Sequence, residues 1–326
     1  EFSKAREKSF NCIQQPGGIE VWNTENVSGL EKQIASLLGL KNYSRRNLSV
    51  EPDPQNYFSF FSELPGQDVR FRLLGYNDEI LLESECFSNL LQAKVAALQI
   101  IKAGMNRNNY GDHTIVNNSL NIPLQITNSG GITEIFAYAS INIQINDDEI
   151  ILRNKVIANV INRLIQIHKE GEGLYIVEHV LLRPTVPDNT SVDLLMTTHI
   201  NDDNQTKDPY SFRISIVLPS GFLTDFNSVN SVIKERTWST RFRNLDFRRL
   251  VEKIIIQETP AHILPRIYWL HANSGIDNPT TPSLNRFETV YREWLEAKTD
   301  ASVTESAYIN AQENLVRVLN IIIQNQ

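Results

Sequence analysis

The feature that most constrains the fold of this chain is the spacing of its apolar residues. Segments in which they recur at every second residue, as in a strand, alternate with segments in which they recur at helical spacing. Residues 57–61, 69–74 and 80–85 have the pattern of three strands separated by turns. A helix is then expected from Ser88 or Asn89 to Ile101, ended by Gly104. Its inward residues would be Ala93, Ala96, Ala97, Ile100 and Ile101. A three-stranded sheet covered by one helix is the simplest structure that buries this pattern.

A similar order of elements follows. After a polar loop over residues 110–120, strands are expected at 122–127, 134–139 and 141–145, with an acidic turn at 146–149. A short strand at 150–152 and a helix over 156–167 complete the segment. Asp78-Glu79-Ile80-Leu81-Leu82 also resembles Asp148-Glu149-Ile150-Ile151-Leu152. Residues 111–172 are therefore a possible degenerate second copy of the first unit.

The following part combines strands with a helical crossover. Strands are expected at residues 174–182, 194–200 and 210–218, the last with Phe212, Ile214, Ile216 and Leu218 alternating and with Pro219-Ser220-Gly221 at its end. A helix over 245–257 stops at Thr259-Pro260, and a strand over 263–270 follows, which is a βαβ crossover. In that strand Tyr268 and Trp269 should lie on opposite faces, one in the core and one toward a neighbouring protein.

The two ends of the chain are expected to be helical and to pack on something else. Ser28 and Glu31 form a capping box, and Leu30, Ile34, Leu37 and Leu38 then recur at helical spacing up to Gly39. Arg45-Arg46 has the character of a solvated turn. At the other end, helices are expected over 284–297 and 302–324, and the last one could pack on a partner as a tail.

The predicted fold class is therefore α+β, built from several small modules. The expected boundaries are 1–54 for an N-terminal linker with a docking helix, 55–110 for the first sheet-plus-helix module, 111–172 for the second, 173–278 for a βαβ-containing, ferredoxin-like domain and 279–326 for C-terminal helices. The 326 residues exceed one average domain, in agreement with this division.

Charge and composition narrow the function classes. Lys plus Arg is 31 and Asp plus Glu is 38, so the net charge of −7 argues against a general nucleic-acid or anionic-membrane binder. The apolar runs are too short for a membrane helix, and no signal peptide is evident. The missing initiator Met suggests a fragment or a processed chain. Cys12 and Cys86 are expected to be free thiols in a reducing compartment.

No residue pattern predicts a catalytic, cofactor or metal site. Glu178-His179, His262 and His271 lack metal-ligand spacing, and Asp147-Asp148-Glu149 and Asp202-Asp203 have the character of solvated turns. The basic and aromatic stretch 236–249 is expected to be a protein interface, with plain structure and single-stranded nucleic acid as alternatives. The candidate interface residues are Arg236, Trp238, Arg241, Phe242, Arg243, Arg248, Arg249, Tyr268 and Trp294.

Two stretches resemble known families. Phe71-Arg72-Leu73, Asn77-Asp78-Glu79-Ile80-Leu81, Ser84-Glu85, Phe87-Ser88-Asn89 and the Ala-rich helix that follows resemble the small YegP-like ββ(β)α repeat. The family implies a fold and carries no catalytic residues. The helix of this chain is poorer in Gly and Asn at its start than the usual family helix.

The second resemblance covers roughly residues 174–297. Three of the segments that carry it are Glu178-His179-Val180-Leu181-Leu182-Arg183-Pro184, residues 208–219 and residues 247–252. The fourth is Glu258-Thr259-Pro260-Ala261-His262-Ile263 together with the residues that follow it up to Leu270. The last matching residues are Phe287, Tyr291, Trp294 and Leu295. They resemble the C-terminal region of large baseplate proteins of extracellular contractile injection systems, which are phage-tail-like particles.

That resemblance implies a structural, non-enzymatic role without cofactors. The implied partners are other baseplate, sheath or tube proteins, in several copies around a ring that is commonly six-fold in such particles. The implied location is the bacterial cytoplasm during assembly, and then an injection particle that is cytoplasmic, membrane-docked or released. The alternatives are a binding or adhesion module of another multi-protein or cell-surface assembly, and an unrecognised hydrolase.

Overall fold

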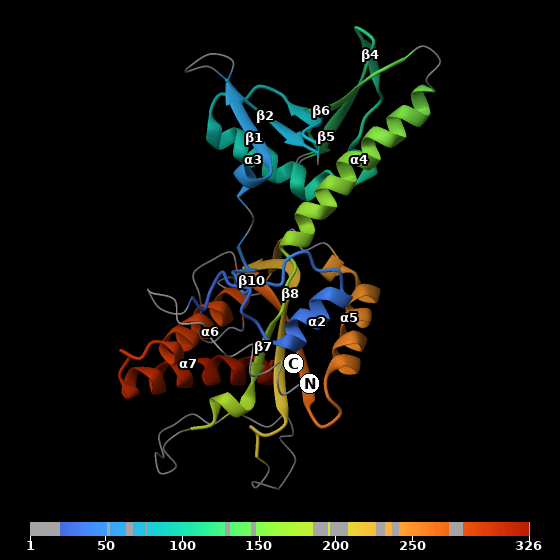
Figure 1. Cartoon of the computed structure of the whole chain (residues 1–326). Helices are drawn as coiled ribbons and strands as arrows, with labels where there is room; N and C mark the ends of the chain where they lie inside the picture. The colour runs from blue at the N-terminus through green and yellow to red at the C-terminus, as the bar shows by residue number, and fades with distance from the viewer. Residues whose placement is uncertain are drawn as a thin grey trace. The chain divides into compact units, whose positions relative to one another are not determined.

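A computed structural model describes residues 20–50, 53–62, 68–75, 77–127, 131–144, 148–184, 195, 208–225, 232–236, 241–273 and 283–325, of which 223–225, 232–236 and 273 are described by backbone alone. Contacts divide the chain into two compact units, one formed by residues 1–50 and 172–326 and the other by residues 51–171. The protein is α+β (Figure 1). Cys12, Trp238, Asp147, Asp202, Asp203 and most of the strand expected at 194–200 lie outside the described residues.

The unit of residues 51–171 is a six-stranded antiparallel sheet with two helices. Its strands are β1 (Phe58–Ser62), β2 (Val69–Leu74), β3 (Ile80–Ser84), β4 (Thr114–Val116), β5 (Ser119–Thr127) and β6 (Thr133–Asn142), in the order β1-β2-β3-β6-β5-β4. Helices α3 (Leu90–Ala103) and α4 (Glu149–Glu170) follow the third strand of each half. The two halves thus have the same element order and meet at the β3–β6 pair.

The first half matches the sequence-based expectation closely. Asn89 caps α3, its inward residues Ala93, Ala96, Ala97, Ile100 and Ile101 are all buried, and Gly104 ends it. The core beside this helix contains Phe71 and Leu73 of β2. Local patterning therefore decides this half of the sheet.

The second half corrects three expectations. The predicted loop at 110–120 contains strand β4, which is joined to β5 by Asn117 and Asn118 with φ of 49° and 59°. Such a pair forms a tight hairpin turn. The two strands expected at 134–139 and 141–145 are one strand, β6. Residues 150–152 are not a strand but the first turn of α4, because the Asp148 carboxylate accepts from the backbone of Ile150 and Ile151.

The other unit is a mixed sheet covered on both faces (Figure 1). Strand β8 (Arg213–Asp225) is central, with β7 (Tyr175–Glu178) antiparallel on one side and β10 (Leu264–Asn273) parallel on the other. Strand β9 (Val232–Arg236) pairs with the end of β8. After β9 and a 3-10 helix at Arg241–Arg243, helix α5 (Leu245–Glu258) leads into β10, which is parallel to β8, so the predicted βαβ crossover is confirmed.

Each face of this sheet has its own core. Helices α2 (Gly29–Leu37) and α5 cover one face, where Ile34, Ile216 and Ile255 are buried. Helices α6 (Leu284–Thr299) and α7 (Glu305–Gln324) cover the other. Leu315, Leu319 and Ile322 of α7 are buried there, so the expectation that this helix is a tail for a partner is wrong.

Two further expectations about the sheet are corrected, and one concerns its two faces. Strand β7 stops at Glu178, and residues 179–182 form a 3-10 helix rather than the end of a long strand. Pro219-Ser220-Gly221 does not end β8, because Gly221 at φ 77° and a bulge opposite let the strand continue. Tyr268 and Trp269 lie on opposite faces as expected: Tyr268 is buried in one core, and Trp269 is partly buried against the other.

Candidate functional site

Most of the predicted interface residues serve the interior of their own unit. Arg241 pairs with the buried carboxylate of Glu172 and lies 4.7 Å from the centre of the Phe247 ring. Arg248 donates to the carbonyl groups of Phe242 and Ser220 and lies 4.7 Å from the centre of the Trp269 ring. Both arginines therefore stabilise the packing of α5, and of the 3-10 helix Arg241–Arg243 that precedes it, within their own unit.

The aromatic members of that set are enclosed by the chain. Phe242, Tyr268 and Trp294 are 0%, 3% and 2% exposed, so they offer no surface to a partner. Arg249 is exposed and pairs with Asp246, three residues earlier in α5, and Arg243 is half-buried. The side chain of Arg236 and all of Trp238 lie outside the described residues.

The described residues include two serine–histidine pairs, in which His179, Ser215 and Ser220 are buried and His271 is half-buried. His179 Nε2 lies 2.7 Å from Ser215 Oγ, and its Nδ1 lies 3.2 Å from the carbonyl oxygen of Pro209. Burial lowers the pKa of His179 to about 4. His271 contacts Ser220 Oγ through its Nδ1, and partial burial lowers its pKa as well. Because Ser215 and Ser220 are 0% and 1% exposed, neither hydroxyl can meet a substrate in this conformation.

An exposed apolar surface forms where β8 begins. We call it the Phe212 surface, and it consists of Val180, Phe212, His262 and Leu264. The side chains of Phe212, Val180 and Leu264 are 67%, 49% and 52% exposed. Phe212 was expected to alternate into the core, but its φ of 57° turns it outward, where it meets the His262 ring edge-to-face at 5.8 Å. A cavity of about 230 Å³ opens beside Val180, Phe212 and His262, and its lining includes Glu178, Arg213 and Ile263.

The backbone at Phe212 is strained. A bulky residue in the left-handed region is a conformational outlier, and such outliers persist where the surrounding structure imposes them. Here the carbonyl of Phe212 accepts from the backbone of Leu264 at 2.7 Å, which starts the β8–β10 pairing. The structure therefore holds an aromatic ring in solvent at a conformational cost.

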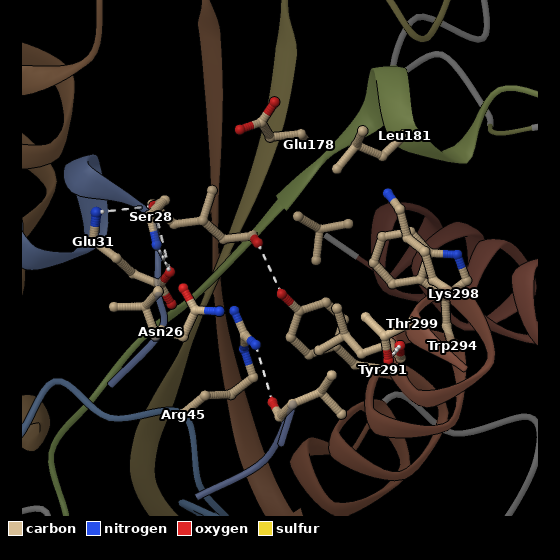
Figure 2. Close-up of a pocket in the computed structure, with 15 residues that line it drawn as sticks. Asn26, Ser28, Glu31, Arg45, Glu178, Leu181, Tyr291, Trp294, Lys298 and Thr299 are labelled. Carbon is tan, nitrogen blue, oxygen red and sulfur yellow. Dashed lines mark hydrogen bonds between the residues drawn. The ribbon is translucent and has the colours of Figure 1, made fainter. Parts of the chain in front are cut away.

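A second pocket lies along the β7 edge. We call it the β7-edge pocket; its volume is about 100 Å³. It is lined by Val21, Asn26, Val27, Ser28, Glu31, Arg45, Ile176, Val177, Glu178, Leu181, Tyr291, Trp294, Leu295, Lys298 and Thr299. Figure 2 shows Asn26, Glu31 and Arg45 on one side of it and Trp294 and Lys298 on the other, with Tyr291 between.

Local structure explains how the polar side of this pocket is built. The predicted capping box is confirmed: Glu31 N–H donates to Ser28 Oγ at 3.1 Å, and Ser28 N–H donates to the Glu31 carboxylate at 3.2 Å. The same carboxylate accepts from the backbone of Ile176, and the Tyr291 hydroxyl donates to the Ile176 carbonyl at 3.1 Å. Ile176 belongs to β7, the edge strand of the sheet. Side chains from α2 and α6 thereby form hydrogen bonds with the main-chain N–H and C=O groups of Ile176 that an edge strand would otherwise leave unpaired.

The electrostatics of the pocket follow from burial. Desolvation raises the pKa of Glu31 to about 7, although Arg45 and the hydrogen bonds from Ser28 and Ile176 act in the opposite direction. Burial also raises the pKa of Tyr291 to about 12. Arg45 was expected in a solvated turn, but its Nη1 donates to the Val21 carbonyl at 3.0 Å and its guanidinium lies 5.8 Å from the centre of the Tyr291 ring.

Within the described ranges, no group of three or more His, Cys, Asp or Glu side chains could hold a metal ion. The described helices include none that is long and apolar enough to cross a membrane. No protein-family model matches the chain, and a search of curated proteins found no match.

Proposed function

We propose that the chain is a structural component of the baseplate of a contractile, phage-tail-like injection particle, acting through protein–protein interfaces without catalysis. The observation that carries the proposal is the Phe212 surface. Its residues come from the segments 178–184, 208–219 and 258–270, which also carry the resemblance to baseplate proteins. Segments far apart in sequence thus converge on one exposed apolar surface.

The energetics of this surface favour a docking role. A non-glycine residue in the left-handed region costs about 1–2 kcal/mol. An exposed Phe ring also forgoes the roughly 1.5–3 kcal/mol that burial provides. A partner that covers Phe212, Val180 and Leu264 would recover the free energy that burial of the Phe212 ring provides. The cavity beside the ring could receive one side chain of that partner.

The finer architecture is part of the same proposal. We assign residues 55–110 and 111–172 to two YegP-like units, supported by their shared order of three strands and a helix and by their meeting at β3 and β6. We assign residues 173–278 to a ferredoxin-like baseplate domain, supported by the β8–α5–β10 crossover. The YegP-like units would then be inserted adhesion or spacing modules.

The proposed partners are other baseplate, sheath or tube proteins, in several copies around the particle axis. Assembly would take place in the bacterial cytoplasm, before the particle docks or is released.

A second candidate function is a binding module of another assembly. One observation favours it: α3 exposes Leu90, Leu91 and Val95, which are 42%, 73% and 51% exposed. These three apolar side chains on the sheet-plus-helix unit offer a docking stripe that does not involve the Phe212 surface.

The test is a pair of substitutions, each of which introduces a charge, expressed in the native source. Phe212→Glu places a carboxylate on the Phe212 surface, and Leu245→Glu places one on α5 at a side chain with the same exposed fraction, 67%. We expect Phe212→Glu to be lost from sedimented particles and Leu245→Glu to remain in them. Equal incorporation of both variants would contradict a docking role for this surface.

A further inference from the structure

The two edges of the mixed sheet differ in how the chain protects them. At the β7 edge, the main-chain groups of Ile176 are bonded by side chains: the Glu31 carboxylate accepts from its N–H, and the Tyr291 hydroxyl donates to its C=O. At the other end of the sheet path lies β10, a strand of ten residues that pairs with β8 alone among the described strands. An edge strand without such protection can pair with another chain.

The orientation of the β10 backbone follows from one hydrogen bond. Leu264 N–H donates to the Phe212 carbonyl at 2.7 Å, so the main-chain groups of Leu264 point toward β8. The main-chain groups of successive strand residues point to alternate sides, so those of Ile267 and Trp269 point away from β8. Pro265, which has no N–H, also occupies an outward position, as is typical of a free edge. No described residue bonds the outward main-chain groups of Ile267 and Trp269.

The described part of the chain does not enclose this edge. Ile267 and Trp269 are half-buried, whereas Tyr268 between them is 3% exposed. On the α5 side, the Trp269 indole donates to Glu252 at 2.9 Å, and Ile256, one helical turn later, is 61% exposed. The two outward positions carry apolar side chains, although natural sheets often protect a free edge with a charged one.

The free stretch is short and bounded at both ends. At one end Pro265 cannot donate a hydrogen bond, and at the other a bulge interrupts the pairing of β10 with β8 between Leu270 and Ala272. Ile267 and Trp269 therefore supply the outward donors and acceptors, placed symmetrically about the residue between them. An antiparallel strand with the same spacing would satisfy all of these groups.

We propose that β10 of a second copy of this chain pairs with β10, antiparallel and about a two-fold axis at the Tyr268 backbone. Ile267 would exchange two main-chain hydrogen bonds with the partner's Trp269, and Trp269 would do the same with the partner's Ile267. A second copy fits because the free stretch is its own complement. An aromatic and a β-branched side chain would also lie directly opposite each other, which is a favourable cross-strand pair.

The charge pattern of β10 agrees with this pairing. Arg266 is the only Lys, Arg, Asp or Glu in the strand. The axis at Tyr268 places each Arg266 opposite the partner's Leu270, so the two like charges do not face each other. The inference does not depend on the proposed baseplate role, because the outward main-chain groups of β10 are not part of the Phe212 surface.

The experiment is sedimentation velocity of the full chain between about 1 and 200 μM, a range in which reversible dimers form and dissociate. We expect a monomer at the low end and a dimer at the high end. Amide hydrogen exchange is measured at both ends. The N–H groups of Ile267 and Trp269 should exchange about tenfold more slowly, or slower still, in the dimer. Leu264 N–H, which already donates to Phe212, should not change.

Two variants test the main-chain pairing itself. Ile267→Pro removes one outward N–H and places a ring where the second copy approaches, so the dimer should weaken about tenfold or more. Pro265 has the same orientation, so the strand should tolerate the change, and an unchanged thermal unfolding transition checks this. Ile267→Val keeps the N–H and the β-branched shape and is the matched control. Phe212→Glu tests whether the copies meet through the Phe212 surface instead.

Each outcome decides for or against the proposal. A dimer that protects the Ile267 and Trp269 amides, weakens in Ile267→Pro and persists in Ile267→Val and Phe212→Glu supports it. A chain that stays monomeric up to about 200 μM overturns it and leaves the edge to a strand of a different protein. A dimer retained by folded Ile267→Pro, lost in Phe212→Glu or without protection of the two amides also overturns it. If Ile267→Pro does not fold, the exchange of the unaltered chain decides.

Discussion

Replacing Glu31 by Gln tests the electrostatics of the β7-edge pocket most sharply. The carboxyl group of Glu31 is buried, and its pKa is about 7 in the folded chain against an ordinary value of 4.5. The folded state therefore holds the proton more tightly than the unfolded state. The contribution of Glu31 to stability is greatest below pH 4.5, falls as the pH rises from 4.5 to 7, and stays low above pH 7.

The size of the effect follows from the two pKa values. A difference between 4.5 and about 7 corresponds to about 3 kcal/mol of unfolding free energy. Glutamine cannot ionise, so the Glu31→Gln chain lacks this pH dependence. Relative to wild type, the variant should gain about 3 kcal/mol of stability between pH 4.5 and pH 8.

The assay is denaturant unfolding followed by tryptophan fluorescence across this pH range. All four tryptophans, Trp22, Trp238, Trp269 and Trp294, belong to the unit that contains Glu31. The signal therefore reports that unit alone. Glu293→Gln, which removes an exposed carboxylate from α6, is the matched control for loss of charge. A stability difference that does not change with pH, or that favours wild type at high pH, would refute the reasoning.

Three further predictions concern stability. Phe212→Gly should raise the unfolding free energy by about 1 kcal/mol, because glycine tolerates a φ of 57°, while Phe212→Ala should give no such gain; chemical denaturation of both variants checks this. Glu288→Ala should destabilise the same unit by about 3 kcal/mol or more, since the buried carboxylate accepts hydrogen bonds from Leu48, Ser49 and Tyr175. The decrease in the free energy of unfolding is measured by denaturant unfolding followed by tryptophan fluorescence, and a decrease below about 1 kcal/mol would contradict this prediction. Gly104→Ala should destabilise the 51–171 unit, because the added methyl group would meet Ile100 O and Leu164 Cδ1 at 2.7 Å; faster hydrogen exchange in α3 and α4, with the tryptophan transition unchanged, is the expected result, and unchanged exchange would contradict it.

The elements that the sequence predicted well are those decided by near neighbours. The Ser28–Glu31 capping box needs residues three apart, and the inward face of α3 needs only helical spacing. The β8–α5–β10 crossover also follows from local periods, because a helix between two strands leaves parallel pairing as the simple solution. These predictions required no knowledge of distant contacts.

The failures have identifiable physical causes. Ile150, Ile151 and Leu152 are typical of a strand, but the Asp148 side chain supplies the cap that starts a helix there. Phe212 fits a buried alternation, but pairing with Leu264 holds its backbone in the left-handed region. Neither effect is visible in a window of apolar periodicity.

The candidate sites depend on distant residues. The β7-edge pocket combines residues 21–45, 176–181 and 291–299, which no motif connects. Arg45 could have been noticed as a charge beside a predicted capping helix, but its acceptor at Val21 and its ring contact with Tyr291 require the fold. The predicted basic and aromatic interface shows the opposite error, because Arg241 and Arg248 bind groups inside their own unit.

The proposed baseplate role is tested most directly by sedimenting large particles from the native source and quantifying this chain by mass spectrometry. The account predicts that the chain sediments with sheath and tube proteins at a fixed ratio that does not change on further purification. Recovery of the chain only in the low-mass soluble fraction, while sheath and tube proteins sediment, would contradict it.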